Sequence, residues 1–284
     1  MTLPSRCSLV AGLLLAAQVG PAAAQTLEEG TESEPVAASS SARPLETERD
    51  PWRIEFTPWI WLMGIDGDVG VGPVTARVSQ SFVDILGTSD SIFAFAGRLE
   101  VAHERIGFFL DGFFADLGVE DESGPPGIGD VDVEFEQGML DFALMYRMIE
   151  RQSDAGATGR GLSLDVYAGG RYSSLDLTID PKQLASESRG DQWVDPIIGT
   201  RVILPLGESW HVMVAGDIGG FGVSSDLTWG ATGTLGHDFS LFGLPATASI
   251  GYRAIAWDYE GDGERRFHWD VVQHGLILGL TLRF

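Results

Sequence analysis

The sequence contains a single cysteine, Cys7, and no asparagine among its 284 residues. Cys7 lies in a stretch that we expect to be removed on export. The mature chain would then have no disulfide, no thiolate metal ligand and no cysteine nucleophile. Because asparagine is absent, turns must be built from glycine, aspartate and serine, and a catalytic histidine would lack one of the residues that can orient it.

Basic residues and long apolar runs are also scarce. Lys and Arg number 18 against 41 Asp and Glu, which gives a formal net charge of −23. Such a chain is not expected to bind nucleic acid, which needs a basic surface, or to dock on lipid through a polybasic patch. No segment of the mature chain is long and apolar enough for a transmembrane helix, so a closed β-barrel is the only way it could cross a bilayer.

Motifs for catalysis or metal binding are missing as well. None of the five histidines begins a His-x-Ser motif of the kind used by outer-membrane lipid hydrolases, although a Ser-His-Asp set assembled from distant strands stays open. The acidic clusters at 120–132 and 258–264 lack the twelve-residue calcium pattern, and Asp66-Gly67-Asp68 begins that pattern without completing it. We therefore expect no enzyme activity, no metal and no cofactor. The histidines are His103, His211, His237, His268 and His274.

The first fifty residues divide into two segments of different composition. Arg6, an apolar run at 9–17 and small residues at 22–24 predict a signal peptide over 1–24, with cleavage between Ala24 and Gln25. Residues 25–50 are acidic and serine-rich with almost no large apolar side chains, which predicts a disordered linker. A single folded domain is expected over 51–284.

From residue 52 onward, short segments alternate between apolar and polar residues and are separated by turns. The last of them places five apolar residues at every second position: Leu276, Leu278, Leu280, Leu282 and Phe284. A period of two indicates strands with one face in an apolar medium and the other in a polar one. We predict an all-β fold, a closed antiparallel transmembrane β-barrel of about twelve strands, with ten as the second choice. A short helix is expected near 81–87, capped by Ser79 or Ser81.

When the alternation of each strand is continued along its length, ionisable residues fall on the same face in strand after strand. An arginine facing lipid at mid-membrane costs about 2–4 kcal/mol, so this face must be the lumen. Its near balance of sign favours structural ion pairs that fill a narrow lumen, since buried charges need partners. A pore lining that attracts a polar solute is the alternative, and a buried catalytic group is the least favoured. The ladder comprises Arg53, Glu55, Arg98, Glu100, Asp111, Asp141, Asp165, Arg171, Asp195, Arg201, Asp217, Arg253 and Arg283.

The eight tryptophans lie mostly near the ends of the predicted strands. This placement is typical of the aromatic girdles at the two membrane interfaces. Trp59 and Trp61 are different, because their phase puts them in the lumen. There they could stack on a sugar or fill space, and we favour filling.

The C-terminal strand resembles the closing strand of bacterial outer-membrane β-barrels. Gly279, Leu282 and the terminal Phe284 match the signal that the barrel-assembly machinery reads, although Ile277 stands where a polar residue is usual. The segments 195–201, 216–222 and 251–253 resemble a poorly characterised group of proteobacterial outer-membrane barrels that has no agreed substrate. The resemblance implies location in the outer membrane and contact with its lipid and lipopolysaccharide.

The expected function follows from this class of protein. A narrow channel for small polar solutes is the first expectation. The alternative is a closed structural or adhesive barrel that acts through its extracellular loops, and a lipid-modifying enzyme or a soluble periplasmic β-protein is less favoured. The solute and the oligomeric state stay open.

Overall fold

The computed structural model describes residues 52–71, 74–89, 91–123, 130–151, 160–181, 187–261 and 267–284. The chain divides into two units, Met1–Glu48 and Arg49–Phe284, and every described residue belongs to the second. The predicted signal peptide, its cleavage site at Ala24 and Gln25, and nearly all of the predicted linker lie in the first unit, outside the described residues.

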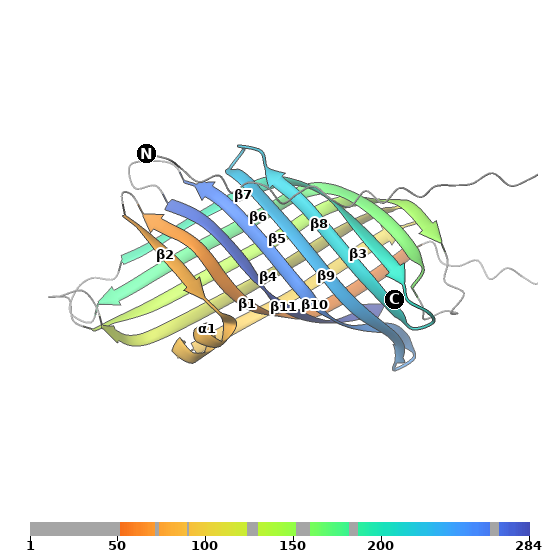
Figure 1. Cartoon of the computed structure of the whole chain (residues 1–284), viewed down its shortest axis with the longest axis horizontal. Helices are drawn as coiled ribbons and strands as arrows, with labels where there is room; N and C mark the ends of the chain where they lie inside the picture. The colour runs from red at the N-terminus through yellow and green to blue at the C-terminus, as the bar shows by residue number, and fades with distance from the viewer. Residues whose placement is uncertain are drawn as a thin grey trace, which may run out of the picture. The chain divides into compact units, whose positions relative to one another are not determined.

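The described chain forms one antiparallel sheet that closes on itself, with a single short helix (Figure 1). Neighbours in sequence pair with each other from β3 to β11, and β11 pairs with β1 to close the barrel. The elements are β1 (Trp52–Val71), β2 (Val74–Gln80), α1 (Phe82–Thr88), β3 (Ser91–His103), β4 (Ile106–Ser123), β5 (Asp130–Arg151), β6 (Leu162–Pro181), β7 (Glu187–Pro205), β8 (Trp210–Gly220), β9 (Ser225–Leu241), β10 (Leu244–Glu260) and β11 (Phe267–Arg283).

Ten of the strands in the described chain form the closed wall, so the first choice of twelve was wrong and the second choice of ten is confirmed. The error lies between residues 52 and 80. Residues 52–62 and 65–71, which lie on either side of Gly64, form one continuous strand, β1, which passes through Gly64 and Gly67 without a break. The remainder, β2, pairs with β1 alone and does not enter the wall.

The predicted helix is present as α1, and its N-cap is Ser81. The Ser81 side chain accepts a hydrogen bond from the Asp84 backbone N–H, and the Asp84 carboxylate accepts one from the Ser81 backbone N–H. This reciprocal capping box satisfies donors that the first helical turn leaves free. Hydrogen bonds from Ser81 lower the pKa of the exposed Asp84 carboxyl.

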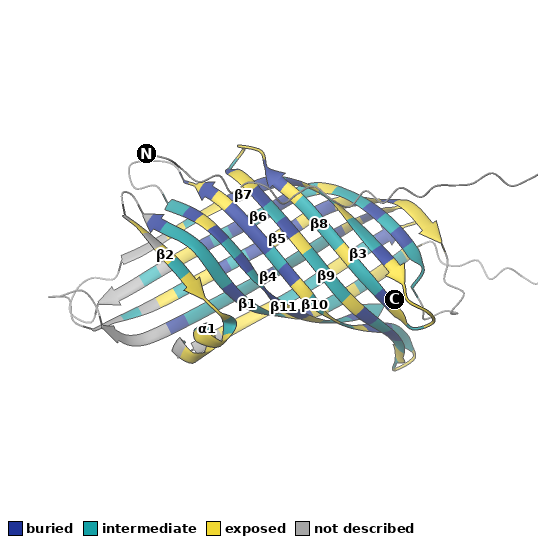
Figure 2. Ribbon diagram, in the orientation of Figure 1, coloured by how far each residue is buried: buried dark blue, intermediate teal, exposed yellow. Residues whose placement is uncertain are grey.

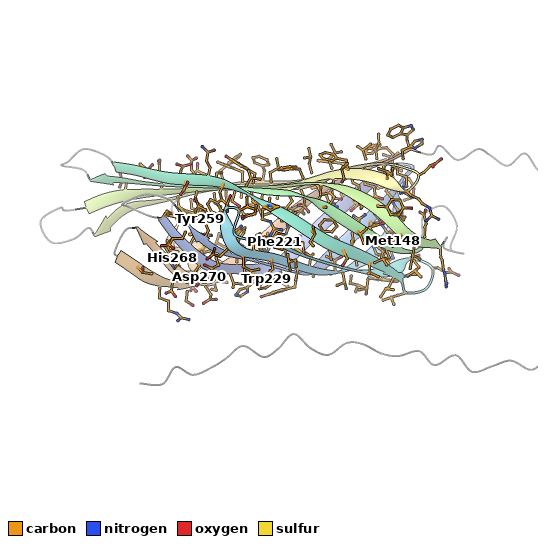
Figure 3. The ribbon with its side chains drawn as sticks, turned by 90° about the horizontal axis from the view of Figure 1, so that it is seen from above. Met148, Phe221, Trp229, Tyr259, His268 and Asp270 are labelled. Carbon is orange, nitrogen blue, oxygen red and sulfur yellow. The ribbon has the colours of Figure 1, made fainter. Side chains whose placement is uncertain are left out.

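Halfway along the barrel, the outward and inward faces of the strands exchange their polarity. We call the end that holds Trp52 and Phe284 the terminal end and the opposite end the distal end. In the terminal half the outward residues are apolar: on β5, Leu144 is 66% exposed, whereas the inward Met145 is 3% exposed. Figure 2 shows this alternation along the strands, and Figure 3 shows Met148 near the terminal end and His268 and Asp270 towards the distal end.

In the distal half the outward residues become polar or acidic and the inward residues become apolar. Spanning strands need about 9–11 residues, whereas β1 has 20 and β5 has 22. Each long strand therefore continues well beyond an apolar band, and the distal half has the polar exterior and apolar interior of a water-soluble protein. Its outward acids include Asp66, Asp68, Asp116, Glu134, Glu136, Asp176, Asp258 and Asp270.

A seam interrupts the wall between β1 and β3. β1 pairs with β3 from Trp52 to Pro58 and with β2 from Ile65 to Val71. Among the described residues, neither Trp59–Gly64 of β1 nor Ser91–Ala96 of β3 has a ladder partner across the seam. Pro58 is the last residue of β1 in the ladder with β3.

Cysteine pairs would test the seam in a chain whose own Cys7 is replaced by serine. Ile54 and Val101 are register partners, and such partners have Cβ atoms about 4.5–5.5 Å apart, so the pair Ile54→Cys with Val101→Cys should oxidise readily. Ile60→Cys with Phe95→Cys continues the same register into the seam and should stay reduced. Thiol titration of the folded protein measures both, and equal oxidation would contradict the seam.

Candidate functional site in the barrel interior

The lumen of the terminal half is filled by ion pairs. Among the described residues, seven arginines and seven acids meet there, and each lies within ion-pair distance of at least one partner. The positive and negative charges of this set are therefore equal in number. The arginines are 98, 147, 160, 171, 201, 253 and 283, and the acids are Glu55, Glu100, Asp111, Asp141, Asp165, Asp217 and Asp238.

One ion pair joins nearly opposite walls. Glu100 on β3 accepts from Nη1 and Nη2 of Arg201 on β7, at 2.6 and 2.9 Å. Arg201 also donates to Asp165 at 2.8 Å, and Glu100 also accepts from Arg98. Glu100 is 5% exposed, so this bridge lies in the interior of the barrel. The fork geometry of guanidinium suits such paired contacts with carboxylates.

A second group lies closer to the middle of the barrel. Arg171 donates to both oxygens of Asp141, at 2.8 and 2.9 Å, and to Asp217 at 3.0 Å. Arg253 on β10 reaches Asp111 on β4, at 3.3 Å, and its guanidinium lies 5.0 Å from the ring centre of Trp59. Arg171 is 1% exposed, so its charge depends on these partners.

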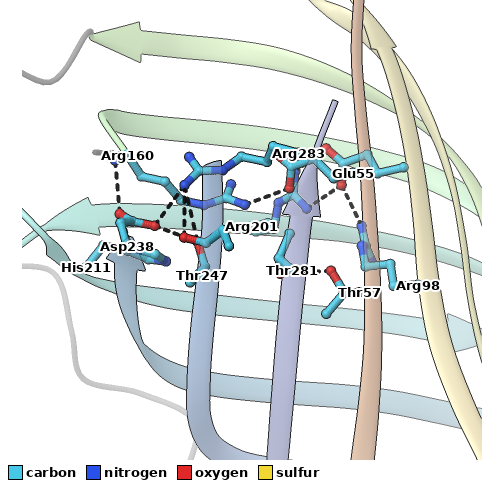
Figure 4. A network of polar contacts seen from close by, with 12 residues as sticks. Glu55, Thr57, Arg98, Arg160, Arg201, His211, Asp238, Thr247, Thr281 and Arg283 are labelled. Carbon is cyan, nitrogen blue, oxygen red and sulfur yellow. Dashed lines mark hydrogen bonds and ion pairs between the residues drawn. The ribbon is translucent and has the colours of Figure 1, made fainter. Parts of the chain in front are cut away.

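A third group lies at the terminal end (Figure 4). Asp238 on β9 accepts from Thr247 Oγ1 at 2.5 Å and from Arg283 at 3.2 Å, and it contacts Nδ1 of His211 at 3.0 Å. Arg160 donates to Glu55 at 2.7 Å, and its backbone N–H donates to Asp238. The segment that precedes β6 thereby joins the lumenal network.

Eleven of the thirteen predicted ladder residues lie in this network, and two do not. Arg53 lies at the terminal rim, where it donates to Glu150 at 2.9 Å with its side chain one-third exposed. Asp195 is buried, but it accepts from Trp193 Nε1 at 3.0 Å and from the backbone and hydroxyl of Ser225. It therefore anchors the turn between β8 and β9.

The prediction missed three charged members, Arg147, Arg160 and Asp238, and also His211, which contacts Asp238. Arg147 could have been found, because it shares the phase of Asp141 on β5 and pairs with Asp165 at 2.7 Å. Arg160 lies outside any strand, so no alternation marks it.

A partly open space of about 160 Å³ remains beside the ion pairs. Its lining includes charged side chains such as Arg98, Asp111 and Arg253 and hydroxyl side chains such as Thr232, Thr234 and Ser249. A polar cavity of this size holds a few waters.

The lumen of the distal half is filled by aromatic and aliphatic side chains. Trp193 on β7 stacks on Tyr259 on β10 with ring centres 3.9 Å apart, and Phe135 on β5 stacks with Trp269 on β11 at 6.3 Å. Trp257 is 2% exposed. The girdle interpretation was wrong for Trp193, Trp257 and Trp269, which lie inside because the distal half is inverted.

Trp59 and Trp61 point inward, as their phase predicted. Both contact Phe113, with ring centres at 6.4 and 5.5 Å. They lie in or against the buried apolar cluster, which agrees with the interpretation that they fill space.

A pair of glutamines bridges the lumen within the apolar cluster. Gln137 on β5 and Gln273 on β11 exchange two side-chain hydrogen bonds, at 2.9 and 2.7 Å, and both are buried. Each side-chain amide satisfies the other.

This pair predicts a clear double-mutant cycle. Gln137→Leu leaves the Gln273 amide buried and unpaired, which should lower the free energy of unfolding by about 1–3 kcal/mol. Changing both residues to leucine removes both unpaired groups and should restore most of that stability. Urea unfolding of the single and double variants measures this. Additive losses would contradict the bridge.

Two other kinds of feature are absent from the described part of the chain. No three residues among its His, Cys, Asp and Glu are arranged so that they could hold a metal ion. No helix in this part of the chain has the length and apolarity required to cross a membrane.

The architecture defines the class of protein. A closed antiparallel barrel with an apolar outer band and a charged interior is a transmembrane β-barrel of the outer-membrane type. The terminal end carries the short connections, such as Glu104–Arg105 between β3 and β4, and in this class that end faces the periplasm. Longer connections, such as those at the opposite end, are typical of the extracellular side in this class.

Comparisons with known proteins place the chain no further than this class. No family model and no curated protein matches it. Solved structures with some likeness include Ail, the attachment invasion locus protein of Yersinia pestis (12% identity, 81% of this chain and 99% of that chain, TM-score 0.32). Others are the translocator domain of the autotransporter NalP from Neisseria meningitidis (14%, 84% and 91%, 0.29) and the P. putida toluene transporter TodX (8%, 83% and 90%, 0.20). Scores this low transfer neither function nor partner.

Proposed function

We propose that the protein is a closed outer-membrane barrel that acts at the cell surface through its projecting distal half. The observation that carries this proposal is the inversion of the strand faces. The interior is occupied by ion pairs in the membrane half and by aromatic packing in the distal half, while the exposed acids lie on the outside of the distal half.

The carboxylates on the exterior of the distal half are the groups that would contact a partner. Asp116, Glu136 and Asp176 are register neighbours on β4, β5 and β6. Asp68, Asp270 and Asp258 form a second such row on β1, β11 and β10. Like charges directly opposite each other destabilise a sheet, so these rows cost stability and favour a cationic partner. We propose an adhesive role toward basic surfaces.

Adhesion of cells that display the protein tests this function. Cells should bind a polylysine surface more than a polyglutamate surface, and the combined Glu134→Gln, Glu136→Gln and Asp176→Gln variant should bind polylysine less. Glu208→Gln, in the exposed turn after β7, is the matched control and should leave binding unchanged. Equal adhesion of all three proteins at equal surface amounts would contradict the proposal.

A narrow channel for small polar solutes is the second candidate. The polar cavity of about 160 Å³ favours it, because a small movement of the ion pairs could extend that space. Bridges across the lumen, such as that between Glu100 and Arg201, count against it.

A further inference from the structure

A groove of about 1070 Å³ lies at the terminal end, lined by residues of β1, β3, β4 and β5. Its apolar lining consists of Trp52, Val101, Ile106, Phe108, Leu144 and Tyr146. The most exposed of these side chains are Leu144 at 66% and Ile106 at 64%. The groove therefore continues the apolar band of the barrel to its periplasmic rim.

The strand register builds the groove in two rows. Trp52, His103, Ile106 and Tyr146 are successive register partners at the rim. Val101, Phe108 and Leu144 form the next row toward the membrane. Amphipathic aromatic side chains at the rim, Trp52 and Tyr146, and wholly apolar ones below suit the boundary between headgroups and acyl chains.

A rigid turn borders the groove. Glu104 adopts a left-handed backbone with φ 51°, which makes the connection between β3 and β4 tight. Arg53 Nη2 donates to the Glu104 carbonyl oxygen at 3.1 Å and holds the turn. The turn therefore presents the neighbouring Arg105 at a fixed place on the edge.

The charges around the groove leave Arg105 available. The Glu150 carboxylate, which also lines the groove, accepts from Arg53 at 2.9 Å and from Arg147 at 3.0 Å. Among the described residues, no carboxylate lies within ion-pair distance of Arg105. Arg53, Arg105 and Arg151 outnumber Glu104 and Glu150 at this rim, so a local cationic patch exists in a chain whose net charge is −23. The net charge of the whole chain gives no indication of this patch.

We propose that this groove binds an anionic phospholipid of the periplasmic leaflet. The phosphate faces Arg105, and an acyl chain lies along Val101, Phe108 and Leu144. Charge complementarity selects an anionic headgroup, and continuity with the apolar band selects a lipid over a soluble phosphate. One arginine near a membrane surface contributes about 1 kcal/mol, which corresponds to roughly fivefold in affinity.

Lipid retention by the full mature chain tests the proposal. The protein is reconstituted in discs of phosphatidylcholine with a minor fraction of phosphatidylglycerol, released in mild detergent and weighed by native mass spectrometry. Retained phosphatidylglycerol should exceed its share of the disc by about fivefold. Arg105→Gln should remove this enrichment, and Arg105→Lys should keep most of it. Arg77→Gln, which changes an exposed arginine of β2 in the distal half, is the matched control and should behave as wild type.

Three results would overturn the proposal. They are wild-type retention in proportion to disc composition, unchanged enrichment in Arg105→Gln, and an equal loss in Arg77→Gln. Heat-modifiable migration on gels establishes that each variant is folded, so a loss of enrichment cannot come from a collapsed barrel. Adhesion through the distal half is a separate property, and it should be unaffected by Arg105→Gln.

Discussion

Replacing Glu100 with alanine is expected to lower the free energy of unfolding by about 3–5 kcal/mol, because it leaves buried arginine charge without a partner. Glu100 is the carboxylate that Arg201 reaches across the lumen and that Arg98 also contacts. Arg201 would keep only Asp165, and Arg98 would keep only Asp111. Equilibrium unfolding in urea, in lipid vesicles, measures the loss.

The control for this variant is Glu208→Ala. Glu208 lies in the exposed turn between β7 and β8, where substitutions usually change stability by less than about 0.5 kcal/mol. If Glu100→Ala lost less than about 1 kcal/mol, the bridge would behave as a hydrated surface ion pair. That outcome would mean that water fills the lumen around Glu100.

Replacing Trp257 with alanine is expected to lower the free energy of unfolding by about 3–5 kcal/mol, as for other large buried aromatics. Trp257 is 2% exposed and packs in the apolar cluster of the distal half. The cost arises from the cavity left among neighbours that the barrel wall holds in place.

Trp210→Ala is the matched comparison, because Trp210 is also in the barrel wall but faces outward and is 47% exposed. Trp210→Ala should lower the free energy of unfolding by a clearly smaller amount in the same urea titration. Equal losses would contradict the inversion of faces, since both tryptophans would then have similar surroundings.

The sequence predicted the barrel and the phase of its strands because alternation is a local property. Leu276 to Phe284 and Leu140 to Tyr146 each repeat every two residues, and the structure places them on the outside. The number of strands was harder to predict. β1 continues through Gly64 and Gly67, and β2 pairs outside the wall.

The partners within the lumen could not be predicted from the sequence. Glu100 and Arg201 are 101 residues apart, and only the curvature of the closed barrel brings β3 opposite β7. The inversion of faces could not be read from the sequence either. The strands keep the same alternation throughout, but the exterior changes from apolar to polar halfway along the barrel and the interior changes the other way. For this reason Trp257 and Trp269, which lie near strand ends, were assigned to the interfaces rather than to a core.

Conductance across a planar bilayer tests the closed lumen most directly. The protein is reconstituted after gel migration has shown that it is folded, and a general porin serves as the positive control. A lumen filled by bridges such as that between Glu100 and Arg201 predicts no stable unitary current. Reproducible unitary steps whose ion selectivity changes in Arg201→Ala or Asp217→Ala would contradict the closed barrel and establish the charged network as a pore lining.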